Sequence, residues 1–323
     1  MKENFYEELT RILTPEQIYQ NEPMKNHTTF RIGGPADWFV TPSTKEEIEK
    51  LMKLGTSCSM EVHLVGNGSN LLVGDLGIRG LVIQIGRAFS EIQVQEDRIY
   101  AQAGASLARI ASQAYENSLA GFEFAGGIPG TLGGAVTMNA GAYGGEMKDV
   151  LTSVEILQPD GRIEEIPAKE LNLSYRYSRV PEEGWIVLGA WIQLKKGEKT
   201  DIKAQMDEYS LARRTKQPLE YPSAGSTFKR PEGYFAGKLI QDSGLRGARV
   251  GDAMVSEKHC GFLINAGEAT ARQMQSLICQ VQKKIFLDSG DAKIKLQTEV
   301  KMIGEFLPLE PMEPMRLTGK DEA

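Results

Sequence analysis

Glycines form the first candidate site. Residues 126–145, GGIPGTLGGAVTMNAGAYGG, hold eight glycines and no charged side chain, while the whole chain has 34 glycines in 323 residues. Glycine is favoured where the backbone takes a positive φ or must lie close to a ligand. Backbone N–H groups in such a turn bind anions without help from a cationic side chain. A Walker-type loop would end in Lys-Ser or Lys-Thr, which this stretch lacks. The stretch therefore predicts a site for a diphosphate that is bound but not transferred.

A second, shorter loop, GNGSN at residues 66–70, follows the strand-like segment VHLV. It resembles a dinucleotide-binding fingerprint only in part, because a second strand follows it where the fingerprint requires a helix. Considered alone, this loop is better interpreted as a tight turn. Together, the two uncharged glycine-rich loops favour one elongated ligand with a pyrophosphate in its middle.

Three side chains elsewhere have the chemistry for catalysis. Arg176 carries the planar donor group that forks onto a carboxylate or phosphate. Ser226 lies in the small-residue loop SAGSTFKR, and Glu299 lies in the alternating segment IKLQTEVKMI, where burial would keep a carboxyl group protonated. A surface arginine, a turn serine and a solvent-facing glutamate are the simpler interpretations when each is considered alone.

Lys216, Lys229 and Arg230 are cations of the loop at residues 213–231. They are either solvated surface charges or the cations for a second anionic ligand. The chain has no GxSxG motif, so we do not expect a hydrolase nucleophile.

Charge and composition exclude several other classes. The net charge is −6 and no dense Lys/Arg stripe occurs, so we expect no nucleic-acid partner. Three histidines show no metal-ligand spacing, and three distant cysteines are expected to be reduced thiols, so no bound metal is expected. The N-terminus lacks the apolar region of a signal peptide, and no apolar run approaches the roughly 20 residues of a membrane span, so we expect a cytoplasmic protein.

The order of elements predicts an α+β fold. Helices are expected at residues 3–13, 44–54, 106–119, 201–214, 237–245 and 270–287, with capping boxes at Thr44 and Thr270. A hairpin is expected at residues 154–166 with Asp-Gly at its turn, and alternating residues 294–303 predict a strand. We expect an N-terminal helical segment at 1–27, domains at 28–200 and 201–306, and a disordered tail at 307–323.

A series of segments resembles one family. They are TTFRIGGPAD, LVGNGSNLLVGDLGIRGLVI, GGIPGTLGGAVTMNAGAYGGE, YRYS, PSAGSTFKRP, AGKLIQDSGLRG, VSEKHCGFLIN and LQTEVKMIG, in that order between residues 25 and 304. In these segments the chain resembles the UDP-N-acetylenolpyruvoylglucosamine reductases, also called UDP-N-acetylmuramate dehydrogenases, of bacterial cell-wall synthesis. It is similar to their shorter second type, because no inserted tyrosine-bearing loop is present.

The resemblance implies an FAD-binding fold of the vanillyl-alcohol-oxidase kind and a C-terminal α+β domain that binds a UDP-sugar. Residues implied to bind FAD are Gly66, Asn67, Gly68, Ser69, Asn70, Leu71, Gly126, Gly127, Ile128, Gly130, Thr131, Gly133, Gly134, Asn139 and Gly141. Residues implied to bind the substrate or NADPH are Tyr175, Lys216, Lys229, Arg230 and Asn265.

The resemblance also implies a reaction in which NADPH reduces the flavin, and the flavin then passes hydride to the enolpyruvyl group. It implies that Arg176 and Glu299 stabilise an enolate and that Ser226 donates the proton. Two alternatives are a flavin oxidase on the same fold, which would use oxygen, and a nucleotide-binding module without catalysis. We rank both below the reductase.

Overall fold

A computed structural model describes residues 2–290, 294–309 and 313–317. The chain forms two compact units, and each has its own apolar core. Unit 1 consists of Met1–Gln20, Trp38–Asn67 and Gly80–Arg213, and unit 2 consists of Asn21–Asp37, Gly68–Arg79 and Arg214–Ala323. The chain thus passes between the units five times. Three passages lie within strands β1 (Ile18–Pro23), β2 (Pro35–Val40) and β5 (Ile78–Gln84), and the others lie between Asn67 and Gly68 and between Arg213 and Arg214.

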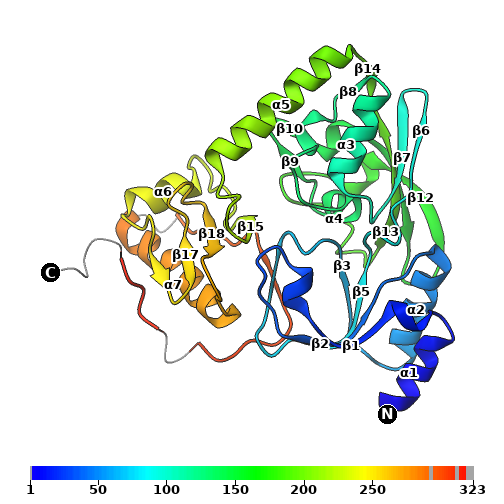
Figure 1. Ribbon diagram of the computed structural model, residues 1–323, viewed down its shortest axis with the longest axis horizontal. Helices are drawn as coiled ribbons and strands as arrows, with labels where there is room; N and C mark the ends of the chain where they lie inside the picture. Colours follow the sequence, from blue (N-terminus) through cyan, green and yellow to red (C-terminus); the bar gives the residue numbers. More distant parts are fainter. Residues whose placement is uncertain (1, 291–293, 310–312, 318–323) are drawn as a thin grey trace. The chain divides into compact units, whose positions relative to one another are not determined.

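An antiparallel five-stranded sheet is the largest element of unit 1 (Figure 1). Its order is β12 (Ile163–Pro167), β11 (Leu151–Leu157), β13 (Ile186–Gln193), β7 (Arg98–Gln102) and β6 (Ile92–Gln95). The central strand β13, IVLGAWIQ, is apolar and mostly buried, as expected of a strand with neighbours on both edges. Helix α4 (Leu132–Thr137) packs on β13 and β7, and α3 (Leu107–Glu116) packs on β6 and β7. The glycine-rich stretch therefore rests on the sheet through α4.

Two helices and a parallel strand pair complete the N-terminal part of unit 1. Strand β3 (Val62–Val65) runs parallel to β5, in a sheet of order β1-β2-β5-β3. Helix α2 (Lys45–Ser57) begins at Thr44, whose hydroxyl accepts a hydrogen bond from the backbone N of Glu47 (3.1 Å). Helix α1 (Lys2–Thr10) packs through the ring of Phe5, whose centroid lies 5.5 Å from that of Trp38.

The remaining elements are two short strand pairs, helix α5 and several 3₁₀ helices. Strands β8 (Leu119–Ala120) and β14 (Lys195–Lys196) pair, as do β9 (Gly141–Ala142) and β10 (Gly145–Glu146), and α5 spans Lys199–Lys216. The 3₁₀ helices are η1 (Pro15–Gln17), η2 (Met24–His27), η3 (Glu123–Ala125), η4 (Met147–Asp149) and η5 (Ala168–Leu171).

Unit 2 is built around an antiparallel sheet and a long helix (Figure 1). The sheet has the order β15 (Ser223–Ser226), β18 (Phe262–Asn265), β17 (Ala253–Val255) and β16 (Arg249–Val250). Helix α7 (Ala271–Ser289) packs on β16 and β17 and contacts α6 (Ala236–Asp242). Strands β4 (Leu71–Val73) and β19 (Lys301–Ile303) form a parallel pair, with Leu71 opposite Lys301.

The structure confirms the α+β class and most of the expected helices, including both reciprocal bonds of the Thr270 capping box. Helix α4 was not expected. The expected strand at 294–303 is shorter, because only β19 and an isolated bridge at Thr298 pair there. The linear domains expected at 28–200 and 201–306 do not describe the interleaved units, in which residues 21–37 and 68–79 lie in unit 2.

The expected tail at 307–323 lies partly outside the described residues. Where it is described, Arg316 exchanges backbone hydrogen bonds with Arg249 (2.8 and 2.9 Å), and the backbone N of Met315 donates to Gln280 (2.9 Å). The expectation of disorder is therefore wrong for residues 313–317, because main-chain pairing holds them to unit 2.

Candidate functional site

The glycine-rich stretch of unit 1 is tied to the start of α3. The backbone N of Leu107 donates to the carbonyl of Gly130 (3.2 Å), and the N of Leu132 donates to the carbonyl of Ala105 (2.9 Å). Ser106 and Thr131 form an isolated bridge between the two segments. These main-chain bonds hold residues 130–132 at a fixed place before α4, so the loop has a preformed shape.

The structure brings the two glycine-rich loops together within unit 1. A Cβ atom on Gly66 would lie 2.4 Å from the hydroxyl of Thr131, which is too close for any real side chain. The Asn67 side chain donates to the carbonyl of Pro129 (3.3 Å). Gly66 therefore lacks a side chain because the loops touch, and one elongated ligand can contact both of them.

Gly133 and Gly134 in α4 lack side chains for different reasons. A Cβ atom on Gly133 would lie 3.0 Å from the Cβ of Ala103, a contact tight enough to explain the glycine by packing alone. A Cβ atom on Gly134 would meet only the hydroxyl of Thr131 at 3.7 Å, an ordinary contact. Gly134 is exposed and disfavours a helix, so protein packing does not account for it. The expected contact of Gly134 with FAD stays a prediction that this space allows.

The sequence did not predict two features beside these loops, a hollow and a cation. The hollow of about 450 Å³ is lined by Thr41, Gln84, Gly86, Arg87 and Ala88, and the Gln84 side chain donates to the carbonyl of Gly66 (3.2 Å). One sequence feature could have indicated the hollow: the short segment Gly86-Arg87-Ala88 follows closely after the buried strand β5.

Arg213 of α5 is the missed cation. Its Nη1 atom lies 2.7 Å from where a Cβ on Gly127 would be, and burial lowers the pKa of its guanidinium. The glycine-rich stretch thus has a cation beside it, which comes from helix α5, 86 positions after Gly127, and not from the stretch itself. Nothing in the local sequence marks Arg213 among its charged neighbours.

Arg176 sits at the tip of a tight turn in unit 1. The backbones of Ser174 and Tyr177 exchange two hydrogen bonds of 3.1 Å, which leaves Tyr175 and Arg176 between them. Arg176 has a φ of 55°, a left-handed conformation that a non-glycine residue adopts only when its surroundings impose it. Its guanidinium lies 5.1 Å from the ring of Tyr175 and donates to the carbonyl of Gly141 (3.4 Å). The turn thus presents Arg176 beside β9 of the glycine-rich stretch.

The structure also brings the Ser226 and Glu299 segments together, within unit 2. The backbone N of Glu299 donates to the carbonyl of Thr227 (2.8 Å), and the N of Lys229 donates to the carbonyl of Gln297 (2.8 Å). Residues 227–229 are therefore held between β18 on one side and residues 297–299 on the other. Glu299 is half-buried, whereas Ser226 is exposed.

A β-bulge sets the direction of Ser226. Ser223 pairs with Ile264 and Ser226 pairs with Phe262, so β15 has one residue more than β18 between these pairs. Gly225 takes up the extra length with a φ of 73°, which a side chain would strain. Bulges re-aim side chains next to functional sites. Within the described chain the Ser226 hydroxyl has no hydrogen-bond partner, which leaves its proton available to a substrate.

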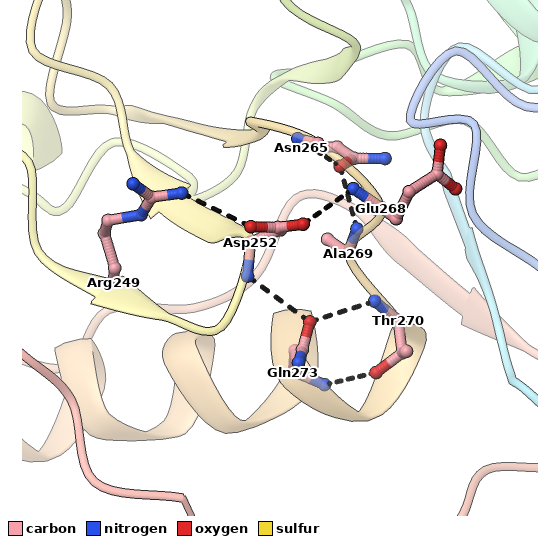
Figure 2. A network of polar contacts seen from close by, with 8 residues as sticks. Arg249, Asp252, Asn265, Glu268, Ala269, Thr270 and Gln273 are labelled. Carbon is pink, nitrogen blue, oxygen red and sulfur yellow. Dashed lines mark hydrogen bonds and ion pairs between the residues drawn. The ribbon is translucent and has the colours of Figure 1, made fainter.

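Asn265, expected to bind the substrate or NADPH, is buried and hydrogen-bonded within unit 2. It is 3% exposed, its side-chain oxygen accepts from the backbone N of Gly267 (3.1 Å) and of Ala269 (2.9 Å), and its nitrogen donates to the carbonyl of Phe30 (3.1 Å). Figure 2 shows this amide beside the hydrogen bond that the backbone N of Glu268 donates to the carboxylate of Asp252 (2.8 Å). The amide shapes the turn that begins α7.

The remaining expected ligands are placed as follows. Arg230 lies 4.7 Å from the ring of Phe235, Lys229 is half-buried, and Tyr175 and Lys216 are exposed. In the first loop Ser69 is half-buried and Gly68 has a φ of 62°, and in the second Ile128 is half-buried. Asn139 is completely buried, with its side chain bonded inside unit 1.

No disulfide joins the cysteines: Cys58 is exposed, Cys260 is buried and Cys279 is half-buried. Burial raises the pKa of the Cys260 and Cys279 thiols. In the described ranges no three His, Cys, Asp or Glu side chains gather as metal ligands. None of the helices in those ranges has the length and apolar character needed to cross a membrane.

Two domain families match the chain. Residues 36–167 match an FAD-binding domain, and residues 217–303 match the C-terminal domain of UDP-N-acetylenolpyruvoylglucosamine reductase. The first range contains both glycine-rich loops in full, and the second contains Ser226 and Glu299. Arg176 lies between the two ranges.

Whole proteins match as well. The chain is 55% identical over 318 residues to UDP-N-acetylenolpyruvoylglucosamine reductase of Agathobacter rectalis, covering 95% of this chain and 100% of that protein. It is 46% identical over 303 residues to the enzyme of the same name from Clostridioides difficile, covering 94% and 99%. The crystal structure of UDP-N-acetylenolpyruvylglucosamine reductase from Thermus caldophilus matches with a TM-score of 0.75 at 36% identity, over 88% of this chain and 98% of that one.

Proposed function

Because the chain belongs to the family of UDP-N-acetylenolpyruvoylglucosamine reductases, which are FAD-dependent enzymes of peptidoglycan precursor synthesis, we propose that it reduces UDP-N-acetylglucosamine enolpyruvate to UDP-N-acetylmuramate with electrons from NADPH. The activity would belong to the cytoplasm and would support wall growth, cell shape and division.

One observation carries the assignment of the reaction to particular residues. Two backbone hydrogen bonds of 2.8 Å hold residues 226–229 next to residues 297–299 in unit 2. The first segment contains Ser226 and Lys229, with Arg230 next in the chain, and the second contains the carboxyl group of Glu299. They are far apart in the sequence, and both fall in the range that matches the reductase C-terminal domain. A serine, a cation and a carboxyl group are the types that protonation next to a carboxylate requires.

The FAD would be held by backbone groups of the two glycine-rich loops, and the hollow beside Gly66 would take one end of this elongated molecule. When bound, FAD supplies the hydride that is received from NADPH and given to the terminal carbon of the enolpyruvyl group. The preformed loops contribute binding and orientation, since their N–H groups need no rearrangement to meet the diphosphate.

Arg176 and Glu299 would stabilise the charge that develops on the substrate. As hydride adds to the enolpyruvyl group, its carboxylate takes on enolate character. The Arg176 guanidinium can donate two parallel hydrogen bonds to a carboxylate. Glu299, if protonated, can donate a third hydrogen bond as a neutral acid. Fixed donors of this kind lower the barrier because they are already aimed where the charge forms.

Ser226 would donate the proton to the carbon next to the carboxylate. The bulge at Gly225 exposes its hydroxyl, and Lys229 and Arg230 follow in the same loop. A hydroxyl is a weak acid in water, so nearby positive charge is needed to help it release a proton. We also propose Tyr175, Lys216, Lys229, Arg230 and Asn265 as ligands of the UDP-sugar or NADPH. The bonds of Asn265 to Gly267 and Ala269 hold its amide in place.

The two half-reactions test the proposal. The purified protein should be yellow, should bleach when NADPH is added without oxygen, and should regain its colour when the UDP-enolpyruvyl sugar is added. A flavin that bleaches but regains colour only with oxygen would favour an oxidase. A colourless protein that cannot take up FAD would contradict the proposal.

Arg176→Ala gives a residue-level test. It should slow reoxidation by the sugar on the order of 10²-fold or more, the scale for losing one preorganised charge partner in the transition state. Flavin reduction by NADPH should change much less. Equal loss in both half-reactions would show that Arg176 has a structural or nicotinamide-binding role instead.

A further inference from the structure

Asn139, directly after helix α4, has no solvent exposure, although it belongs to a stretch expected to contact the cofactor. Its side-chain nitrogen donates to the Oε2 atom of Glu146 (3.0 Å) and to the backbone carbonyl of Ser174 (3.0 Å). Its side-chain oxygen accepts from the backbone N of Lys148 (2.9 Å). Both amide N–H groups are therefore used inside unit 1, as expected of a buried polar group.

The backbone at this position explains why the residue is asparagine. Asn139 has a φ of 44°, in the left-handed region that is favourable only for Gly, Asn and Asp. Glycine has no side chain to donate a hydrogen bond. Aspartate would place a carboxylate against the Glu146 carboxylate and the Ser174 carbonyl, both of which are acceptors. Asparagine alone accepts this φ and also donates to both partners.

One of these partners belongs to the turn that carries Arg176. The carbonyl of Ser174 accepts from Asn139 and also from the backbone N of Tyr177 (3.1 Å), the bond that closes the turn. On the other side of the turn the Ser178 hydroxyl, which is buried, donates to the carbonyl of Thr137 (2.7 Å). The turn is thus fastened on both sides to the end of α4.

The other partner is Glu146, whose carboxylate is attracted by the positive charge of Arg176. The hydrogen bond from Lys148 holds the pKa of Glu146 below its ordinary value, and Asn139 and the charge of Arg176 act in the same direction. Lys148 Nζ lies 2.6 Å from Oε2 of Glu146. Glu146, Lys148 and Arg176 therefore form a charged group beside the turn, and Asn139 joins the Glu146 carboxylate to the turn.

We propose that Asn139 is a positioning residue for Arg176: its amide fastens the turn at residues 174–177 to the end of the glycine-rich helix and so fixes the direction of the guanidinium. This inference rests on the proposed role of Arg176 in the reductive half-reaction with the sugar. It assigns Asn139 to the placement of a catalytic side chain and not to direct contact with FAD.

The test compares Asn139→Asp and Asn139→Gly with Asn172→Asp as the control. Both Asn139 variants accept a positive φ, but aspartate keeps the shape and loses both donors, while glycine loses the whole side chain. Asn172 is a matched control, since it is exposed with a φ of 51° two residues before the same turn. Flavin content and the rates of both half-reactions are measured by anaerobic stopped-flow absorbance.

We expect both Asn139 variants to retain FAD and to be reduced by NADPH within about twofold of wild type. Reoxidation by the sugar should slow by on the order of 10- to 100-fold, since a displacement of about 1 Å at a catalytic group costs about 10²-fold. In an Arg176→Ala background, Asn139→Asp should slow reoxidation little further, because both changes remove the same interaction. The Asn172 control should behave like wild type in both half-reactions.

The possible failures are distinguishable. If Arg176→Ala reoxidises normally, the proposed role of Arg176 is wrong. If Arg176→Ala is slow but the folded Asn139 variants are as fast as wild type, only the positioning role is wrong. Loss of FAD from the Asn139 variants would show instead that Asn139 serves the cofactor site. If neither variant folds, Asn139→Ser decides: it removes the amide that donates to both partners but keeps a small polar side chain, and a folded variant with a normal reoxidation rate would overturn the inference.

Discussion

The side chain of Asn70 donates a hydrogen bond to the backbone carbonyl of Glu299 (3.1 Å). The backbone N of Lys301 donates in turn to the carbonyl of Asn70 (2.9 Å), so Asn70 brackets Glu299 from the start of the parallel pair β4–β19. The first glycine-rich loop therefore has two attachments. Asn67 is bonded to Pro129 of the second loop in unit 1, and Asn70 is bonded to the backbone of Glu299, the candidate acid, in unit 2.

Asn70→Asp should impair the reaction with the sugar more than flavin binding. The carboxylate cannot donate to the Glu299 carbonyl and repels it, so the backbone at residue 299 shifts and the Glu299 side chain loses its place. We expect reoxidation by the sugar to slow by about 10-fold or more, the scale of a small displacement at a catalytic group. Single-turnover reoxidation of the reduced flavin measures this effect.

Asn67→Asp is the matched comparison, because it makes the same change in the same loop and breaks the bond to Pro129 instead. It should weaken FAD retention and leave the reoxidation rate of the fully loaded enzyme near normal. The prediction for Asn70 is wrong if the two variants show the same pattern of defects.

Gly134→Ala should separate cofactor binding from folding. In the protein alone the added methyl group meets only Thr131 at 3.7 Å, and alanine favours a helix over glycine by roughly 0.8–1 kcal/mol. The cofactor-free variant should therefore melt at the same temperature as wild type or higher, while its affinity for FAD falls by about 10-fold or more. Thermal unfolding and flavin titration of the cofactor-free protein test the two parts.

Gly133→Ala provides the contrast, because its Cβ would lie 3.0 Å from the Cβ of Ala103. Its cofactor-free form should lose stability. A Gly134→Ala protein with unchanged FAD affinity would show that the ligand does not approach the backbone at this point of α4.

Local signals predicted the elements that depend on neighbouring residues. Helix α7 has Thr270 as its N-cap, as expected. A capping box and an apolar face depend on residues only one or two turns apart, so both can be recognised in the local sequence. Helix α4 was missed because LGGAVT contains two glycines and is only six residues long, so its stability comes from packing on β13 and β7. Tertiary packing of this kind leaves no local pattern.

Residue types predicted which side chains have suitable chemistry, but not which ones touch. The segments of Ser226 and Glu299 were each weak candidates alone, and the main-chain bond between Thr227 and Glu299 is what joins them. The family resemblance implied that Asn139 binds FAD and that Asn265 binds the substrate or NADPH. Asn139 is also bonded to Ser174 and Asn265 to Phe30, both far away in the sequence, and these contacts are visible only in the folded chain.

The three thiols should be dispensable for turnover. Cys58 is exposed, while burial raises the pKa of Cys260 and Cys279 and keeps them in the unreactive thiol form at neutral pH. Alkylation of the native protein should therefore modify Cys58 first and leave both half-reactions unchanged. In a triple Cys→Ser variant, serine at the buried position 260 costs about 1–3 kcal/mol through its unpaired hydroxyl, so Cys260→Ala is the control for stability. A variant that folds and binds FAD but has lost turnover would overturn this prediction.

Ser226→Ala should slow one step of the reaction, the protonation of the substrate. Hydride addition to the enolpyruvyl group leaves negative charge on the carbon next to the carboxylate, and a positioned acid contributes about 10²–10⁴-fold to its protonation. The variant should fold, bind FAD and be reduced by NADPH near the normal rate, because the hydroxyl is exposed and has no partner to lose in the described chain. Reoxidation by the sugar should slow by about 10²-fold or more in anaerobic stopped-flow absorbance.

Two further variants show whether the proton itself matters. Ser226→Cys keeps an ionisable proton at the same place on the bulge, so it should reoxidise faster than Ser226→Ala, although more slowly than wild type if the larger sulfur displaces the substrate. Ser223→Ala removes a hydroxyl from the same strand, three residues earlier and before the bulge at Gly225, and should leave reoxidation unchanged. If Ser223→Ala and Ser226→Ala are equally slow, the defect comes from the strand and not from a lost acid. If Ser226→Ala reoxidises as fast as wild type, another group delivers the proton, and Glu299, whose backbone is bonded to Thr227, becomes the first residue to test.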